Sequence, residues 1–476
     1  MKYLFLRSLL IVLSALILFS CGNSTGKKEK SGTVKTDISA WITSPSANVL
    51  FRQSDEAIFF KSEAGPGPVI TVDPSITYQV IDGFGNCLTG GSATLIHKMS
   101  DGARKELLNE LFDSTGNNIR ISYLRISLGA SDLSEHEFTY DDMPAGKTDT
   151  GLTGFSIEAE KKDLIPVLRE ILAINPGIKI LASPWSAPAW MKTNGSLKGG
   201  SLKQEYFKPY ALYFVKYIKA MQAEGINIDA ITIQNEPLNP ANNPSMFMTS
   251  ADQALFIKSA LGPAFRDAGI STKIIVYDHN ADKTSYPMDI YADAEAGKYV
   301  DGAAFHLYGG NISDLTPVHD KYPSKNLYFT EQWVGAPGNM AGDFEWHLVN
   351  LVIGATRNWC RNVLEWNLAA DSAYNPHTEG GCTECLGAVT IDSDKVTRNP
   401  AYYIIAHASK FVSPGSVRID SNIPEGLPNV AFVAPGGRKV LVVYNESAEK
   451  KDFTLKDGNR FAALSLPGKS GATFVW

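Results

Sequence analysis

The chain has 476 residues, of which 44% are hydrophobic and 20% charged, and its formal net charge is −6. This length accommodates two or three domains, or one large barrel with an accessory domain, and the composition is that of a globular protein. The negative net charge gives nucleic-acid binding no electrostatic support.

The first 38 residues have the character of an export signal followed by a linker. An apolar stretch over residues 8–19 follows Lys2 and Arg7; it is too short to span a bilayer and fits a signal peptide. It ends in Leu18-Phe-Ser-Cys21-Gly22, which resembles a bacterial lipobox. We therefore expect a signal peptide over 1–20, lipidation of Cys21 and a linker over 21–38. The alternative is a plain secretory signal with an incidental cysteine.

Short strand-like runs separated by turn residues occupy both ends of the rest of the chain. Near the N-terminus they cover residues 47–51, 57–60 and 69–72, and near the C-terminus 429–433, 439–444, 452–455 and 472–476. We expect segments 39–78 and 411–476 to pair into one β-sandwich.

Between these ends, over residues 79–410, apolar strand-like runs alternate with helical patterns. The runs cover 79–83, 123–127, 179–183, 230–233, 273–277, 302–306, 327–330 and 362–366. Eight such runs predict a (β/α)8 TIM barrel, with an open doubly wound sheet as the alternative. No glycine-rich phosphate loop follows a strand in the required context, which argues against a nucleotide-binding version.

Two glutamates stand at the ends of runs in this barrel. Glu236 follows the fourth run and Glu331 follows the seventh. Because strands of a barrel carry catalytic groups at their carboxyl ends, both carboxylates should meet at one face. A carboxyl pair of this kind is what glycoside hydrolysis requires: one group protonates the leaving oxygen, and the other attacks or stabilises the anomeric carbon. The alternative is that either glutamate belongs to a structural ion pair.

Several short motifs accompany the glutamates in a specific order. They are Asp82-Gly-Phe-Gly85, Arg125-Ile-Ser127, Ser183-Pro-Trp185, Gln234-Asn-Glu-Pro237, His306-Leu-Tyr308, Thr330-Glu-Gln-Trp333 and Glu365-Trp-Asn367. With them the chain, from about residue 45 to residue 476, resembles glycoside hydrolase family 30. The resemblance implies that Glu236 is the acid/base, that Glu331 is the nucleophile and that the anomeric configuration is retained.

The same resemblance implies supporting roles for eight further residues. Arg125 and Tyr308 are expected beside Glu331, and Asn235 at the sugar 2-hydroxyl. Asp132 and His306 are expected at other sugar hydroxyls. Three tryptophans are expected to wall the sugar subsite: Trp185, Trp333 and Trp366. Taken singly, each of the eight has an ordinary structural alternative, such as a salt bridge, a turn, a helix cap or core packing.

Two features bear on the substrate. Leu307 stands where lysosomal glucosylceramidases carry tryptophan, and segment 379–387 resembles the branch of the family that acts on β-1,6-glucans. We therefore expect an endo-β-1,6-glucanase. The alternatives are an exo-acting β-glucosidase, glucosylceramidase or β-xylosidase, and, less favoured, a non-catalytic glycan-binding lipoprotein or a structural envelope protein.

The expected partners are a poly- or oligosaccharide and, through the lipid anchor, a membrane of the cell envelope, with the outer membrane favoured. We expect a monomer, and no cofactor or metal motif is apparent. Cys382 and Cys385 have metal-knuckle spacing, but no second close Cys/His pair accompanies them, which favours a short disulfide over zinc. Cys87 and Cys360 are expected to be buried thiols.

Overall fold

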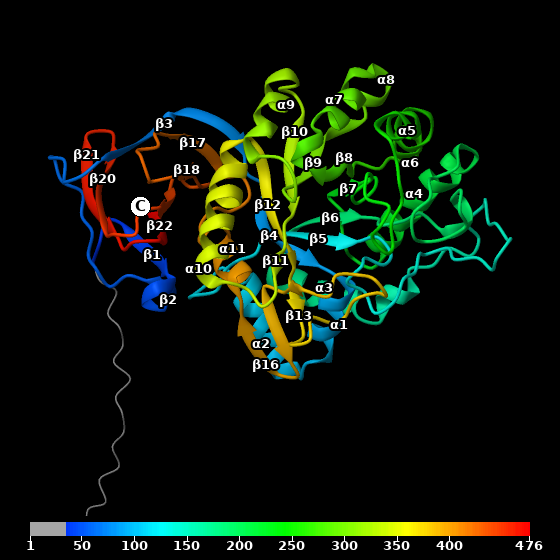
Figure 1. Cartoon of the computed structure of the whole chain (residues 1–476), viewed down its shortest axis with the longest axis horizontal. Helices are drawn as coiled ribbons and strands as arrows, with labels where there is room; N and C mark the ends of the chain where they lie inside the picture. The colour runs from blue at the N-terminus through cyan, green and yellow to red at the C-terminus, as the bar shows by residue number, and fades with distance from the viewer. Residues whose placement is uncertain (1–34) are drawn as a thin grey trace, which may run out of the picture. The chain divides into compact units, whose positions relative to one another are not determined.

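The central part of the chain forms a closed barrel of parallel strands (Figure 1). The structure, a computed structural model, describes residues 35–476, so the expected signal peptide and Cys21 lie outside the described residues. The barrel strands are β4 (Gly83–Leu88), β5 (Tyr123–Ser127), β6 (Lys179–Ser183), β7 (Ala230–Thr232), β8 (Lys273–Asn280), β9 (Val300–His306), β10 (Asn326–Glu331) and β12 (Cys360–Asn367). They close in the order β10-β12-β4-β5-β6-β7-β8-β9, which confirms the barrel and rules out the open sheet.

Helices connect these strands and cover the outside of the barrel. The α-helices are α1 (Gly90–Lys98), α2 (Asp101–Phe112), α3 (Leu164–Ile174), α4 (Phe207–Ala223), α5 (Ser250–Phe256), α6 (Gly262–Ala268), α7 (Ser285–Ala292), α8 (Ala294–Gly297), α9 (Thr316–Lys321), α10 (Met340–His347) and α11 (Pro400–Ser409). Two π-helical stretches, η5 (Ile257–Leu261) and η8 (Leu348–Ala355), continue α5 and α10. Tyr210, Phe214 and Met221 of α4 are buried, as the helical spacing of apolar residues predicts.

The first barrel strand differs from the expectation. The run over 79–83 does not form it: β3 (Val69–Val80) belongs to the sandwich, and the barrel begins with β4 at Gly83. Strand β4 contains two glycines and an asparagine, so its sequence has little strand propensity. Gly85 is required there because a Cβ atom would lie 1.9 Å from the backbone oxygen of Tyr123 on β5. Close approach of the two backbones, rather than side-chain preference, therefore builds this strand.

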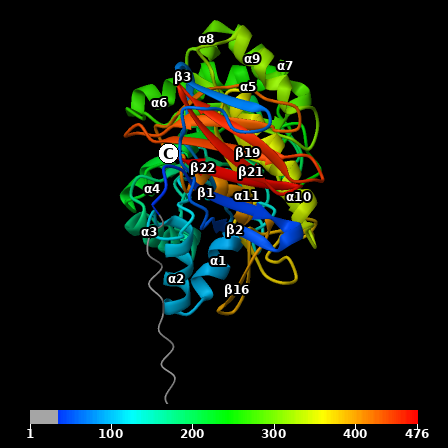
Figure 2. The ribbon, with the colours of Figure 1, turned by 90° about the vertical axis from the view of Figure 1, so that its left-hand side faces the viewer.

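Strands from both ends of the chain form one nine-stranded sheet, as expected for the attached sandwich. Its members are β1 (Ser39–Ser44), β2 (Val49–Gln53), β3, β17 (Val417–Ser421), β18 (Asn429–Val433), β19 (Lys439–Asn445), β20 (Lys451–Asp457), β21 (Arg460–Leu466) and β22 (Ser470–Val475). The order is β2-β1-β22-β19-β18-β17-β3-β20-β21, and Figure 2 shows blue N-terminal and red C-terminal strands side by side. The run over 57–60 forms only an isolated bridge between Ile38 and Ile58.

Short elements complete the chain between and after the barrel strands. The short strands are β11 (Val334–Gly335), β13 (Ala369–Ala370), β14 (Cys385–Leu386), β15 (Val389–Asp392) and β16 (Lys395–Arg398). The 3-10 turns are η1 (Pro45–Ala47), η2 (Glu158–Lys161), η3 (Ala189–Met191), η4 (Gln204–Tyr206), η6 (Ala281–Lys283) and η7 (Ile312–Leu315). Among the residues that the structure describes, no helix combines the length and apolarity that a membrane span requires.

Candidate active site

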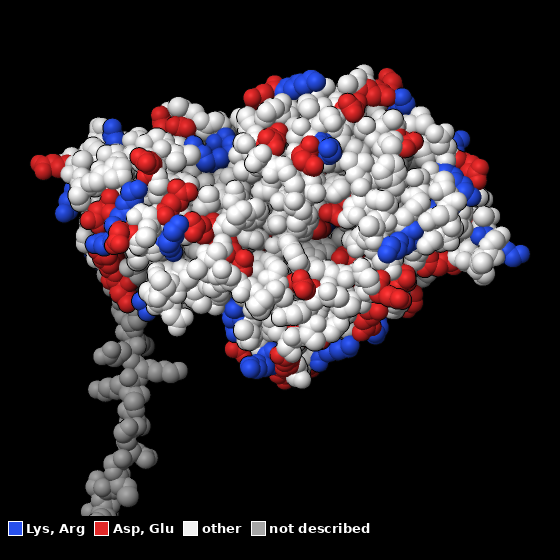
Figure 3. Space-filling view, viewed as in Figure 1, with Lys and Arg blue, Asp and Glu red and all other residues white. Residues whose placement is uncertain are grey.

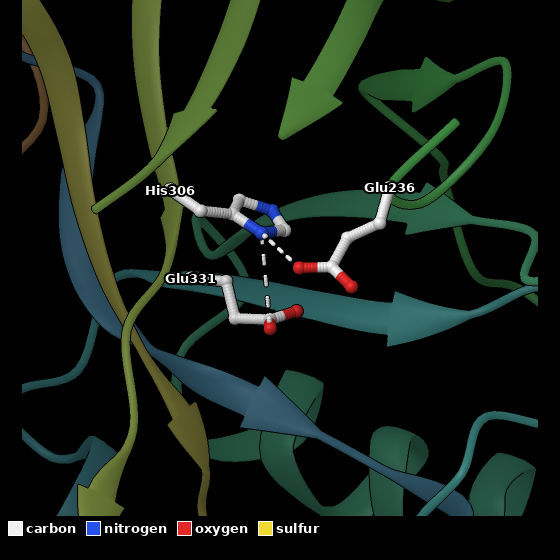
Figure 4. A group of neighbouring side chains, drawn as sticks. All are labelled: Glu236, His306 and Glu331. Atoms are coloured by element: carbon white, nitrogen blue, oxygen red, sulfur yellow. Dashed lines mark hydrogen bonds and ion pairs between the residues drawn. The ribbon is translucent and has the colours of Figure 1, made fainter. Parts of the chain in front are cut away.

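Glu236 and Glu331 lie next to each other at the carboxyl ends of barrel strands. Glu331 is the last residue of β10, and Glu236 lies in the loop after β7 with a backbone φ of 45°. The backbone N–H of Glu236 donates to the carbonyl of Asp278, which fixes this unusual turn. One oxygen of each glutamate and one nitrogen of His306 all lie within 4.8 Å of one another (Figure 4). This closeness agrees with retaining enzymes, in which the two carboxyl groups lie about 5 to 5.5 Å apart.

The protein has an acidic hollow on one face, and both glutamates are shielded from solvent. The face drawn in Figure 3 is hollowed near its middle, and carboxylate groups colour part of the hollow red. Glu236 and Glu331 are both buried, at 8% and 6% exposure. Two ionised carboxylates so close together and so little hydrated need neighbouring positive charge or a shared proton.

His306, at the end of β9, supplies that positive charge. Its Nδ1 atom lies 3.3 Å from Glu236 Oε1 and 3.8 Å from Glu331 Oε1, and its Nε2 lies 3.1 Å from Asp278 Oδ1. Because both ring nitrogens face carboxylates, both donate, and the ring is an imidazolium. Burial opposes this charge, but Glu331, Asp278 and Glu236 outweigh it and raise the pKa of His306 to about 9.

This burial changes the role expected for His306. The residue is completely buried, with both nitrogens turned to carboxylates, rather than open to a sugar hydroxyl. His306 therefore contacts the glutamates from within the protein and not from the side of the sugar. It holds three acidic groups together as a Zn²⁺ ion could, but a metal needs the lone pair of a neutral ring nitrogen. With both nitrogens donating, His306 joins Glu236, Glu331 and Asp278 as an imidazolium.

The stability of the protein should respond to the titration of His306. Its folded pKa of about 9 lies above the 6.5 of an unperturbed ring, so its contribution is complete below pH 6.5 and is lost as the pH rises through 9. We expect the free energy of unfolding to fall by up to about 3 kcal/mol over this interval. Denaturant unfolding at pH 6, 7, 8 and 9 measures the slope. His306→Gln should flatten it, and the same change at exposed His136 should not; an unaltered slope in His306→Gln would contradict the assignment.

The two glutamates have opposite pKa shifts in the free site. Burial tends to raise the pKa of Glu236, but the hydrogen bond and charge of His306 lower it to about 2. For Glu331, burial raises the pKa, and His306 and Arg125 oppose the shift without cancelling it. The free site thus carries its proton on His306. Because these three groups lie in direct contact, a change in charge on any one of them alters the other two.

Arg125 lies beside Glu331, as expected, and contacts the carboxylate oxygen that does not face His306. Its Nη1 donates to Glu331 Oε2 at 2.5 Å, and its Nη2 donates to Asp278 Oδ2 at 2.8 Å and Asn235 Oδ1 at 2.6 Å. The guanidinium is fully buried, and burial alone would lower its pKa, but Asp278 and Glu331 raise it well above its usual range. Because Asn235 Oδ1 accepts from Arg125, the side-chain amide is oriented with its nitrogen free to donate to a sugar.

Replacing Arg125 by lysine should lower kcat at least about tenfold, because a lysine ammonium cannot reproduce the planar fork that joins Glu331, Asp278 and Asn235. We also expect the acidic limb of the kcat profile to move to higher pH, since the positive charge beside Glu331 becomes less well placed. The matched control is Arg169→Lys, at an arginine that pairs with Glu224 and has 56% side-chain exposure. A variant with unchanged kcat and acidic limb would show that Arg125 has no influence on Glu331.

Asp278 was not anticipated and is the most heavily bonded side chain of the site. It is fully buried on β8 and accepts hydrogen bonds from side chains on five elements: Arg125, Ser183, Thr232, His306 and Thr330. Burial would raise its pKa, but Arg125 and His306 hold it far below its usual range. Asp278 thus fixes the two cations that contact the glutamates. The available signal was the polar run Asp278-His279-Asn280 directly after an apolar strand.

The remaining expected residues surround the glutamates. Tyr308 donates its hydroxyl to Glu331 Oε1 at 3.0 Å and is 40% exposed. Trp185 and Trp366 have ring centroids 5.5 Å apart and form a cluster against which Trp333 packs. Asp132 is buried, and burial together with the charges of Glu331 and Glu236 raises its pKa to about 7. Both glutamates are thus near enough for their charges to act on the Asp132 carboxyl.

The cysteines behave as expected. Cys382 and Cys385 form a disulfide, with Cα atoms 5.8 Å apart, and so are not a zinc site. Cys87 and Cys360 are free and buried. Cys385 belongs to the same cluster as Trp185 and Trp366, whose rings lie 4.8 and 5.6 Å from the guanidinium of Arg125, so the disulfide lies near the arginine that contacts Glu331.

Comparison with known proteins agrees with this geometry. Residues 81–412 match the family model described as the glycosyl hydrolase family 30 TIM-barrel domain, and residues 415–474 match the family 30 β-sandwich domain. An endo-1,6-β-D-glucanase of Aspergillus fumigatus is 35% identical over 85% of this chain and 87% of its own length. The lysosomal acid glucosylceramidase of Mus musculus is 30% identical over 87% of this chain and 84% of its own length.

Solved structures give the same result. That of the endo-β-1,6-glucanase BT3312 superposes with a TM-score of 0.86 at 38% identity, covering 93% of this chain and 99% of that one. SrfJ from Salmonella typhimurium superposes with a TM-score of 0.85 at 27% identity, covering 92% and 99%. With both domains matched and the carboxylate pair in place, the chain belongs to glycosyl hydrolase family 30.

Proposed function

We propose that this protein hydrolyses internal linkages of β-1,6-glucan with retention of anomeric configuration. The observation that carries the proposal is the carboxylate pair of Glu236 and Glu331, with oxygens within 4.8 Å, at the ends of the fourth and seventh strands of a family 30 barrel. Carboxyl groups this close suit direct attack of one carboxylate on the sugar, as in retaining enzymes.

The reaction has two steps. In the first, a Glu331 oxygen attacks the anomeric carbon, the glycosidic bond breaks, and Glu236 gives its proton to the departing oxygen. In the second, Glu236 takes a proton from water, the water oxygen attacks the anomeric carbon, and the bond to Glu331 breaks. Arg125 and the hydroxyl of Tyr308 contact the two oxygens of Glu331 and stabilise it as the leaving carboxylate.

Glu236 must be protonated for the first step, although in the free site its pKa is lowered to about 2. The proton lies close by on His306 Nδ1, 3.3 Å from Glu236 Oε1. When a sugar displaces water from the cleft, a neutral imidazole and carboxylic acid become favoured over the ion pair, because desolvation penalises charge. We propose that the proton then moves to Glu236. The transfer removes the charges of Glu236 and His306 together, so Arg125 and the hydroxyl of Tyr308 remain to stabilise the ionised form of Glu331.

The substrate assignment rests on relatives and on one substitution. Endo-1,6-β-D-glucanases of Aspergillus fumigatus, Neurospora crassa and Trichoderma harzianum are 35 to 36% identical to this chain, whereas two glucosylceramidases of Caenorhabditis elegans and Mus musculus are 30 to 31% identical. Leu307, where tryptophan is typical of lysosomal glucosylceramidases, is buried at 8% exposure and offers no aromatic surface to a lipid-linked sugar. Both observations favour a glucan over a glucosylceramide.

The test is to incubate the purified protein with pustulan, laminarin, xylan and glucosylceramide and to separate the products by chain length. The proposal expects pustulan to be cleaved to short gluco-oligosaccharides, with larger fragments appearing before glucose. If pustulan is untouched while an aryl β-glucoside or glucosylceramide is turned over, the enzyme is an exo-acting relative. Inactivity towards every glycoside would support the non-catalytic alternative.

We further propose that the chain is exported, is anchored in the cell envelope, with the outer membrane favoured, through a lipid on Cys21, and acts as a monomer. The support is the charged start, the short apolar stretch and the Leu-Phe-Ser-Cys-Gly sequence. Mass spectrometry of the N-terminal peptide from the membrane fraction should show a lipid-modified Cys21, and Cys21→Ala should abolish that modification. An unmodified mature N-terminus would contradict the anchor, and sedimentation measures the oligomeric state.

A further inference from the structure

The segment that follows β12 and β13 contains the Cys382–Cys385 disulfide. We call residues 378–386 the disulfide loop. Cys385 is buried in the tryptophan cluster, and Cys382 packs against it. The loop is therefore part of the wall beside the glutamate pair.

The disulfide loop holds Asp132 from two sides. The backbone N–H of Thr378 donates to the carbonyl of Asp132 at 2.8 Å, and the backbone N–H of Cys382 acts on the Asp132 carboxyl and lowers its pKa against the effect of burial. The fit is close, since a Cβ atom on Gly381 would lie 2.4 Å from the Asp132 carbonyl oxygen. The position of Asp132 thus depends on the conformation of this loop.

The same loop contacts the segments that carry both glutamates. On the side of Glu236, the hydroxyl of Thr378 donates to the Asn243 carbonyl at 2.6 Å, and Asn243 Nδ2 donates to the Glu379 carbonyl at 2.9 Å. On the side of Glu331, β14 in the loop pairs with β11, which begins at Val334. The backbone N–H of Ala336 also donates to the Glu384 carbonyl at 2.8 Å. One short loop thus joins the connections that follow β5, β7 and β10.

We propose that the disulfide loop is a positioning element. The Cys382–Cys385 bond fixes the shape of the loop, and the loop holds Asp132 in a fixed position relative to Glu236 and Glu331. The disulfide closes so short a ring that its effect on the unfolded chain is small, which leaves local positioning as its main effect. The inference rests on the proposed function, because Asp132 is taken to contact the sugar at the cleaved bond.

The first test compares the wild type with the Cys382→Ser/Cys385→Ser double variant on an aryl β-glucoside and on pustulan. We expect kcat/KM to fall roughly 10- to 100-fold on both substrates, because misplacement of a contact at the cleaved bond affects every substrate. In the double variant the backbone N–H at position 382 should no longer be held against the Asp132 carboxyl, so the pKa of Asp132 should rise. The limb of the kcat/KM profile to which Asp132 contributes should therefore move to higher pH. A loss confined to pustulan, or a lower Tm with unchanged kcat/KM and pH profile, would overturn the proposal.

Two controls keep the test independent of folding. Reducing the folded wild type with a phosphine should lower kcat/KM by the same factor and should leave the double serine variant unchanged. Thr378→Val should also lower kcat/KM by removing the hydroxyl that contacts Asn243, whereas Thr378→Ser should retain most of it. Wild-type inactivity on every glycoside would refute the proposed function, but an active wild type with unaffected variants would refute this inference alone.

Discussion

Glu331→Gln should lower kcat on an aryl β-glucoside by roughly 10⁴- to 10⁶-fold, the range found when an enzymatic nucleophile is removed. Glutamine has almost the same shape, so the hydroxyl of Tyr308 and the guanidinium of Arg125 keep an oxygen or amide to contact. The amide, however, cannot form the glycosyl ester. The loss should appear in kcat, with substrate binding largely preserved, and circular dichroism should show an intact fold.

The control for this loss is Glu365→Gln. Glu365 is as deeply buried on β12, but it pairs with His347 rather than with the groups of the site. We expect it to affect stability more than kcat. If Glu331→Gln retained more than about a hundredth of the wild-type kcat, Glu331 would not be the group that attacks the sugar.

Glu236→Ala should lower kcat on pustulan by about 10²- to 10⁴-fold, the usual contribution of a general acid. A substrate with a good leaving group needs less protonation, so its first step should survive and the glycosyl-enzyme should accumulate. Azide, which is small and anionic, can occupy the space left by the carboxylate and attack in the second step. We therefore expect azide to restore turnover of the activated substrate and to yield the β-glucosyl azide.

Glu331→Ala provides the matched comparison for the azide experiment. There azide would replace the nucleophile and displace the leaving group in a single step, which gives the α-glucosyl azide. The two products differ in anomeric configuration and are separated by NMR. If both variants gave the same azide, or if azide rescued neither, the division of roles between Glu236 and Glu331 would be wrong.

The glutamates could be found from the sequence because strand ends of a barrel are defined by a simple pattern. Each follows an apolar run of ordinary strand composition, and strands four and seven carry them to the same face. Arg125 and Tyr308 were expected beside Glu331 from the family resemblance, and both donate hydrogen bonds to it.

Other features depend on tertiary contacts that no local pattern contains. Strand β8 continues past its apolar part through Tyr277 and Asp278, both at positive φ, where the register with β9 shifts. Their backbone conformation costs energy, which the hydrogen bonds of Asp278 offset. Strand propensity therefore does not predict this part of β8. Strand β4 exists because Gly85 allows close approach of β5. The complete burial of His306 depends likewise on groups from several strands.

The most direct test of the account is to trap the intermediate. A 2-deoxy-2-fluoro-β-glucoside with a good leaving group should inactivate the wild-type enzyme, because fluorine destabilises the oxocarbenium-like transition state and slows hydrolysis of the ester. Mass spectrometry of a peptic digest should then find one added fluoro-sugar, attached to Glu331 in the peptide that contains Thr330-Glu331-Gln332. A label on a different residue, or no label together with α-configured initial products from pustulan, would contradict a retaining mechanism with Glu331 as nucleophile.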